Sequence, residues 1–113
     1  MSVTHRPMDD PDDFTSFDRG RVDTVKIGAA TINRNTFEPG WRWSESVGPI
    51  AGTASCRAHH LGVILSGRLG VETEDGHRAE IGPGEAYEIE PGHDGFVVGD
   101  EPVISIEFLG AVG

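Results

Sequence analysis

The chain has 113 residues and a formal net charge of −10 at pH 7, from 9 lysines and arginines against 19 aspartates and glutamates. This length is typical of one domain, and an acidic chain without a basic cluster is a poor partner for nucleic acid or an anionic membrane surface. The single cysteine excludes an intramolecular disulfide. The sequence shows no basic and apolar leader and no long apolar run, so we expect a cytoplasmic protein whose thiol stays reduced.

Residues 1–20, MSVTHRPMDDPDDFTSFDRG, are rich in acids and contain prolines, so we expect an acidic N-terminal arm that is partly flexible. Phe14 and Phe17 are apolar exceptions, and they would dock either on the domain or on a partner chain. The predicted organisation is therefore an arm over 1–20 and a β-domain over 21–113.

From Val22 onward, short β-branched segments alternate with turns, and the 16 glycines and 7 prolines are spread along the chain. The segments predicted as strands lie in residues 22–37 (two strands broken near Gly28), 41–47, 53–65, 68–74, 77–81, 86–90 and 96–109. Roughly eight to ten short strands, with turns about every 8–12 residues, are typical of an all-β antiparallel sandwich or barrel. No helix of any length is expected, and PGHDG at 91–95 is expected to be a tight turn.

Cys56 and His60 are four residues apart, so in an extended segment their side chains share one face. His93, in a second glycine-rich stretch, is the best candidate for a third ligand. One thiolate and two imidazoles leave a fourth position open, as in catalytic zinc sites. We therefore expect one divalent transition metal, with zinc ahead of nickel, copper or iron; the alternative is a buried structural cysteine and two polar core histidines.

Two further residues are candidate catalytic groups. As a strand, residues 41–47 would place Trp41, Trp43 and Glu45 on one face. If that face lines the cavity, Glu45 is a fourth ligand or general base; otherwise the indoles pack as core and Glu45 lies at the rim. Tyr87 would either donate a hydrogen bond to a ligand or be an ordinary half-buried strand tyrosine.

Neighbours of the candidate ligands have simpler roles. His59 is expected on the opposite strand face from His60, toward solvent. Asp94 would either orient an imidazole or stabilise the turn that contains it.

The spacing of these residues resembles that of a small single-domain bacterial cupin. The first cupin motif usually carries two histidines and a glutamate, and its spacing is kept here by Gly48, Ala54, Cys56, His60 and Gly67. The second motif usually carries one histidine, matched here to His93, which arrives two residues early after Gly84 and Gly92. The chain is most similar to cupins with a C-x3-H first motif and a PGHD second motif.

This resemblance implies a jelly-roll β-barrel and supports a metal at Cys56, His60 and His93. It does not supply a reaction. The expected function is binding or turnover of a small polar metabolite at the metal, with an oxygenase, isomerase or lyase type of reaction if the protein is an enzyme. The alternatives are a non-catalytic ligand-binding or sensing barrel, or a barrel whose metal is only structural. A homodimer is expected because exposed strand edges need covering.

Overall fold

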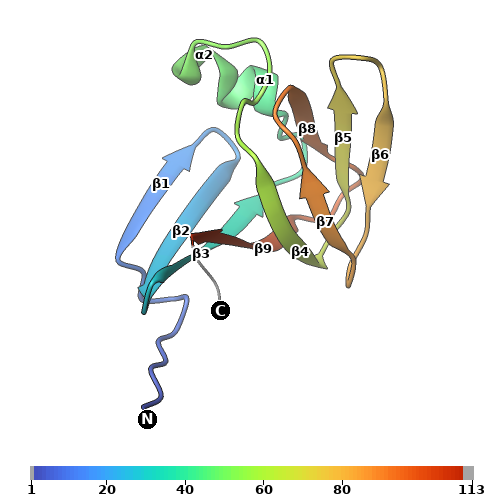
Figure 1. Ribbon diagram of the computed structural model, residues 1–113. Helices are drawn as coiled ribbons and strands as arrows, with labels where there is room; N and C mark the ends of the chain where they lie inside the picture. The colour runs from blue at the N-terminus through green and yellow to red at the C-terminus, as the bar shows by residue number, and fades with distance from the viewer. Residues whose placement is uncertain (1, 111–113) are drawn as a thin grey trace.

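The computed structural model describes residues 2–110, which form nine β-strands and two one-turn helices (Figure 1). The strands are β1 (Asp13–Phe17), β2 (Gly20–Ile27), β3 (Ala30–Phe37), β4 (His60–Ser66), β5 (Leu69–Thr73), β6 (Arg78–Ile81), β7 (Ala86–Ile89), β8 (His93–Val97) and β9 (Val103–Gly110). The helices are α1 (Trp43–Ser46) and α2 (Gly48–Ala51).

The strands form two antiparallel sheets. The larger has the order β1-β2-β3-β9-β4-β7, and the smaller has the order β6-β5-β8. Figure 1 shows the two sheets side by side, with α1 and α2 at one end of the sandwich. The prediction of an all-β jelly-roll barrel is confirmed: β9, which follows β8 of the smaller sheet, lies between β3 and β4 in the larger one.

Local turn chemistry sets the hairpins that the sequence predicted. The break near Gly28 separates β2 from β3, which pair from Gly20–Phe37 to Ile27–Ala30. Asp75-Gly76 joins β5 to β6, and Gly76 has a φ of 86°, a conformation that glycine adopts without steric cost.

The predicted strand over residues 41–47 is wrong, because its central part is α1. The Asp94 carboxylate on β8 accepts hydrogen bonds from the Ser44 backbone N–H at 2.9 Å and the Ser44 hydroxyl at 2.8 Å. It also pairs with Arg42 at 2.9 Å. An acceptor at the first helical turn satisfies a backbone donor that has no partner within the helix, so this contact from a distant strand overrides the local alternation.

Two other boundaries also differ from the prediction. Of residues 53–65, only the part from His60 onward belongs to a long strand, β4. PGHDG is not simply a turn, because β8 begins at His93. Cys56 instead forms an isolated bridge with His93, with its N–H donating to the His93 carbonyl at 2.7 Å.

The core lies between the two sheets. Its buried apolar residues are Trp41, Ile64, Leu69, Val71, Tyr87, Ile89 and Val103. Strand β1 pairs with β2 along its whole length, so residues 13–17 of the predicted arm belong to the larger sheet. Phe17 packs against the core, whereas Phe14 is 54% exposed with the Arg21 guanidinium over its ring. Neither short helix in residues 2–110 has the length and apolar composition needed to cross a bilayer.

Candidate metal centre

Cys56, His60 and His93 lie together at one end of the sandwich, where β4 and β8 begin. Their potential ligand atoms all lie within 4.8 Å of one another. Cys56 Sγ is 3.5 Å from His60 Nε2, and the two imidazole centroids are 5.1 Å apart. Cys56 and His93 are both 5% exposed. The three residues that the sequence singled out therefore form one cluster.

Backbone pairing places the thiol opposite His93. Besides the Cys56 N–H bond to His93, the Gly92 N–H donates to the Cys56 carbonyl at 2.8 Å. Gly92 has a φ of 95°, which favours glycine at this turn. The expected reason for the proximity, one extended strand from Cys56 to His60, is wrong, since residues 57–59 are irregular.

Both imidazoles have their Nδ1 atoms occupied. His93 Nδ1 lies 2.8 Å from the Glu90 carbonyl oxygen, and His60 Nδ1 lies 2.9 Å from Glu107 Oε1. Because a carbonyl oxygen and a carboxylate can only accept, each Nδ1 carries a proton, and Nε2 is the ring atom whose lone pair a metal would take on replacing any proton there. This is the tautomer that a metal-ligating histidine needs.

The donor set and its spacing fit a transition metal. A tetrahedral zinc ion with a Zn–S bond of about 2.3 Å and a Zn–N bond of about 2.05 Å separates sulfur from nitrogen by about 3.6 Å. The 3.5 Å between Cys56 Sγ and His60 Nε2 matches this value. The cluster is thus compatible with a shared ion, although the same distance also suits a thiol–imidazole hydrogen bond.

The electrostatics favour an ionised thiol. Burial alone would raise the pKa of Cys56, but hydrogen bonds from His60 and His93 outweigh it and lower that pKa to about 6. Burial opposes protonation of His60, yet its hydrogen bonds to Cys56 and Glu107 raise its pKa to about 10. Without metal the pair is therefore a thiolate and an imidazolium near neutral pH, and the thiolate is the form that binds metal.

Glu107 on β9 is the residue that the sequence analysis missed. It is 8% exposed and accepts hydrogen bonds from His60 and, at 2.7 Å, from the Tyr87 hydroxyl. Burial works against its ionisation, but the contact with His60 keeps the pKa of Glu107 below its usual value. Burial, together with the charge of Glu107, raises the pKa of Tyr87. The strand VISIEFL hides this residue, because its isoleucines and phenylalanine predict the opposite face as the buried one.

The remaining candidate residues lie outside the cluster. Tyr87 is buried on β7, where its hydroxyl donates to Glu107, and a role for it in ligand binding stays a prediction. Glu45 is exposed on α1 and is not part of the cavity described below, so a catalytic role for it remains a prediction without positional support. His59 is exposed and contacts Glu88 at 2.9 Å, on the side away from the cluster, as expected. Asp94 caps α1 and does not orient an imidazole of the cluster.

A cavity of about 220 Å³ lies beside the cluster, with His60, His93 and Glu107 in its wall. Four aromatic side chains form part of the lining: Phe17, Phe37, Trp41 and Trp43. Five aliphatic side chains form much of the rest: Val22, Val47, Leu69, Val71 and Ile89. Asn33 and Asn35 supply the amide groups. The cavity is thus mainly apolar, with polar groups at the metal cluster and on β3.

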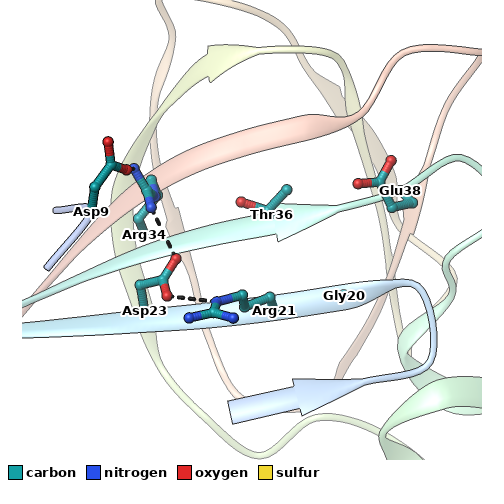
Figure 2. Close-up of a pocket in the computed structure, with 7 residues that line it drawn as sticks. All are labelled: Asp9, Gly20, Arg21, Asp23, Arg34, Thr36 and Glu38. Atoms are coloured by element: carbon teal, nitrogen blue, oxygen red, sulfur yellow. Dashed lines mark hydrogen bonds and ion pairs between the residues drawn. The ribbon is translucent and has the colours of Figure 1, made fainter. Parts of the chain in front are cut away.

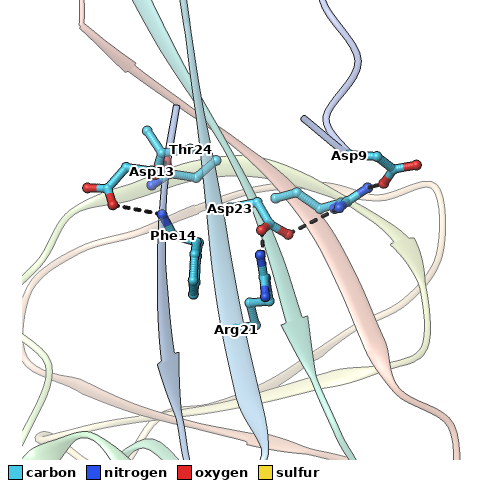
Figure 3. A network of polar contacts seen from close by, with 8 residues as sticks. Asp9, Asp13, Phe14, Arg21, Asp23 and Thr24 are labelled. Carbon is cyan, nitrogen blue, oxygen red and sulfur yellow. Dashed lines mark hydrogen bonds and ion pairs between the residues drawn. The ribbon is translucent and has the colours of Figure 1, made fainter. Parts of the chain in front are cut away.

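A larger hollow, about 400 Å³, lies on the opposite face of the large sheet (Figure 2). There the buried Asp23 accepts from Arg21 at 2.7 Å and from Arg34 at 3.1 Å. Arg34 also pairs with Asp9 at 2.7 Å, so these charges are mutually satisfied (Figure 3). No histidine or cysteine lines this hollow within the described residues, and the smaller cavity is therefore the better candidate for chemistry.

No family model and no curated protein sequence matches the chain. Solved structures do match. One is a cupin-superfamily sugar phosphate isomerase from Silicibacter pomeroyi, with a TM-score of 0.60, 17% identity and coverage of 84% of this chain. The chain spans only 61% of that protein.

Two other similar structures are close to this chain in size. A protein of unknown function from Rhizobium leguminosarum matches with a TM-score of 0.63 and 19% identity, over 98% of this chain and 100% of its own. The Cupin_2 domain of an XRE family transcriptional regulator from Enterobacter cloacae matches with a TM-score of 0.59 and 11% identity, over 84% of this chain and 99% of its own. At these identities the comparisons show the fold, and that fold is the cupin jelly roll.

Proposed function

We propose that this chain is a cupin of the C-x3-H and PGHD type that binds one divalent transition metal, zinc first, through Cys56, His60 and His93. The observation that carries the proposal is the convergence of one thiol and two Nε2 atoms beside a ligand-sized cavity. A small molecule in that cavity would reach the fourth coordination position.

The protein's own groups would prepare this centre. A bound zinc ion would supply Lewis acidity at its open position, moderated by the thiolate charge. Glu107 holds the His60 ring through Nδ1, and Tyr87 holds Glu107. The Glu90 carbonyl does the same for His93. These contacts fix the tautomer and orientation of both imidazoles before any ligand arrives.

An enzyme of oxygenase, isomerase or lyase type and a non-catalytic binding module both remain candidates. The similar structures include a sugar phosphate isomerase and a domain of a transcriptional regulator, so they support either. Glu107 is the only carboxylate among the described cavity-lining residues, and it is already engaged by His60 and Tyr87. That arrangement offers little free proton-transfer capacity, which favours binding or an oxygenase-type reaction over an isomerase.

Elemental analysis tests the metal assignment. We expect close to one zinc per chain in wild type, and a strong loss in both Cys56→Ser and His60→Gln. His59→Gln is the matched control, because His59 is the adjacent histidine but contacts only the exposed Glu88. Full metal occupancy in the Cys56 and His60 variants would remove the proposed centre, including a purely structural metal at it.

Thermal stabilisation by a panel of metabolites, followed by product analysis of each hit, separates enzyme from module. A hit that is consumed supports an enzyme, and a hit that is recovered unchanged supports a binding protein.

The proposed oligomer is a homodimer formed through the outer face of the large sheet. Leu61 and Leu65 on β4 are 52% and 54% exposed, and Phe108 on β9 is 41% exposed. Covering apolar side chains of this size with a partner chain removes them from water, which lowers the free energy of the dimer relative to the separate chains. Sedimentation of Leu65→Glu tests the assignment: we expect a monomer, and an unchanged oligomeric state would exclude this face as the interface.

A further inference from the structure

We propose that the cavity beside the metal cluster takes a small, uncharged aromatic molecule with one oxygen substituent, such as a simple phenol. The ring would lie among the aromatic side chains, with the oxygen toward His60 and His93. This deepens the proposed function and depends on it only for the contact between oxygen and metal.

The charge of the lining excludes strongly anionic ligands. No lysine or arginine lines the cavity within the described residues, and its one carboxylate, Glu107, carries negative charge. The His60 imidazolium is already paired with Cys56 and Glu107. A phosphate group buried there would therefore lose its hydration without gaining a free cationic side chain.

The polar groups are also too few for a sugar. Asn33 already accepts a hydrogen bond from Thr24 at 2.8 Å, and Asn35 donates to Ser105 at 3.2 Å. A polyhydroxylated ligand would leave several hydroxyls facing aromatic and aliphatic carbon without partners, and each buried unpaired group costs free energy. The ligand's polarity is therefore confined to one end, near the histidines.

The remaining wall matches an aromatic ring. Phe37 and Trp41 stack with centroids 3.9 Å apart and planes 10° from parallel, and Phe17 lies 6.2 Å and 6.4 Å from them. Offset and edge-on contacts with further rings are favourable in such a wall.

The volume sets the size of the ligand. An apolar protein cavity of about 150 Å³ holds benzene. By that scale the 220 Å³ cavity holds roughly nine non-hydrogen atoms. A monocyclic phenol with a small substituent fits this limit, whereas a bicyclic aromatic with side groups exceeds it.

Binding of three probes to metal-free and zinc-loaded protein tests the proposal: 4-methylphenol, phenyl phosphate and glucose 6-phosphate. Tryptophan fluorescence is a direct readout, because the chain has 2 tryptophans and both line the cavity. In metal-free protein we expect 4-methylphenol to bind at least about tenfold more tightly than either phosphate ester. Equal or tighter binding of either ester, or no binding of 4-methylphenol, would overturn the assignment.

A matched pair of variants locates the probe. Val22 on β2 lines the cavity, so Val22→Phe should fill it and weaken 4-methylphenol at least about tenfold. Val3→Phe makes the same change at a position that is 87% exposed and not part of the lining, and should leave affinity within about twofold. Equal effects would place the probe elsewhere.

The two proposals fail separately in this design. Failure to bind zinc would contradict the proposed metal centre, whereas binding of 4-methylphenol to metal-free protein would still test the ligand assignment. If zinc binds but 4-methylphenol does not, the metal centre stands and the ligand assignment falls.

Discussion

Replacing Glu107 with glutamine tests whether this buried carboxylate tunes the metal centre. The side chain is 11% exposed and meets His60 Nδ1 at 2.9 Å, so solvent screens the contact only weakly. Glutamine keeps the shape and an acceptor oxygen but removes the charge. Loss of such a supporting contact typically weakens metal binding about 10–100-fold, which corresponds to about 1.4–2.8 kcal/mol. We expect Glu107→Gln to weaken zinc within this range.

Zinc affinity is measured by competition with a chromogenic chelator, and the pKa of His60 in metal-free protein is followed by NMR. We expect that pKa to fall below about 10, because the adjacent negative charge is gone. Glu88→Gln is the control, since Glu88 makes the same 2.9 Å contact with the exposed His59. A Glu107 variant with wild-type zinc affinity and a lowered His60 pKa would refute the reasoning, because the charge of Glu107 would then act on the proton of His60 without affecting metal binding.

Three further outcomes follow from the structure. The two arginines beside Asp23 outweigh its burial and lower its folded-state pKa, so its stabilisation is present above the unfolded pKa of about 3.9 and disappears as pH falls through the folded value. Asp23→Asn should therefore lower the free energy of unfolding by about 2 kcal/mol at neutral pH, and by much less once the pH is below the folded-state pKa. Denaturation across pH checks this. An equal effect of Asp9→Asn, whose carboxylate is 86% exposed, would contradict it. Gly62→Ala would place a Cβ 2.3 Å from a backbone carbonyl oxygen and should lower the free energy of unfolding by about 1–3 kcal/mol or more. Gly95→Ala, whose Cβ would lie 3.5 Å from the nearest atom, should lower it less. Urea denaturation measures both, and a lower midpoint for Gly95→Ala than for Gly62→Ala would contradict the packing argument. In metal-free protein the ultraviolet absorbance of the Cys56 thiolate should titrate near pH 6, and a midpoint near the ordinary thiol value would rule out the thiolate–imidazolium pair.

Many of the strands and turns could be predicted from short sequence patterns. The break at Gly28 and the Asp75-Gly76 turn separate strands whose side chains alternate, and these signals act over a few residues. The nine strands fall within the expected number. Cys56, His60 and His93 were also identifiable, because soft and imidazole ligands are uncommon in a chain with 1 cysteine and 5 histidines.

Other features depended on contacts between residues far apart in the chain. Asp94 converts residues 43–46 from a plausible strand into a helical turn. Glu107 lies 47 positions from His60, and no periodicity in β9 marks it as buried. Glu107 meets His60 only because β9 pairs with β4 in the folded sheet.

The amino-acid order alone therefore determined most of the strand rhythm and the turns at Gly28 and Asp75-Gly76, since these depend on neighbouring residues, and it supplied the three candidate ligands as residue types. The tertiary structure decided which groups support those ligands and what shape the cavity takes. The physical reason is that burial and hydrogen bonding across a jelly roll are set by strand crossovers, and these bring together side chains that no local pattern connects.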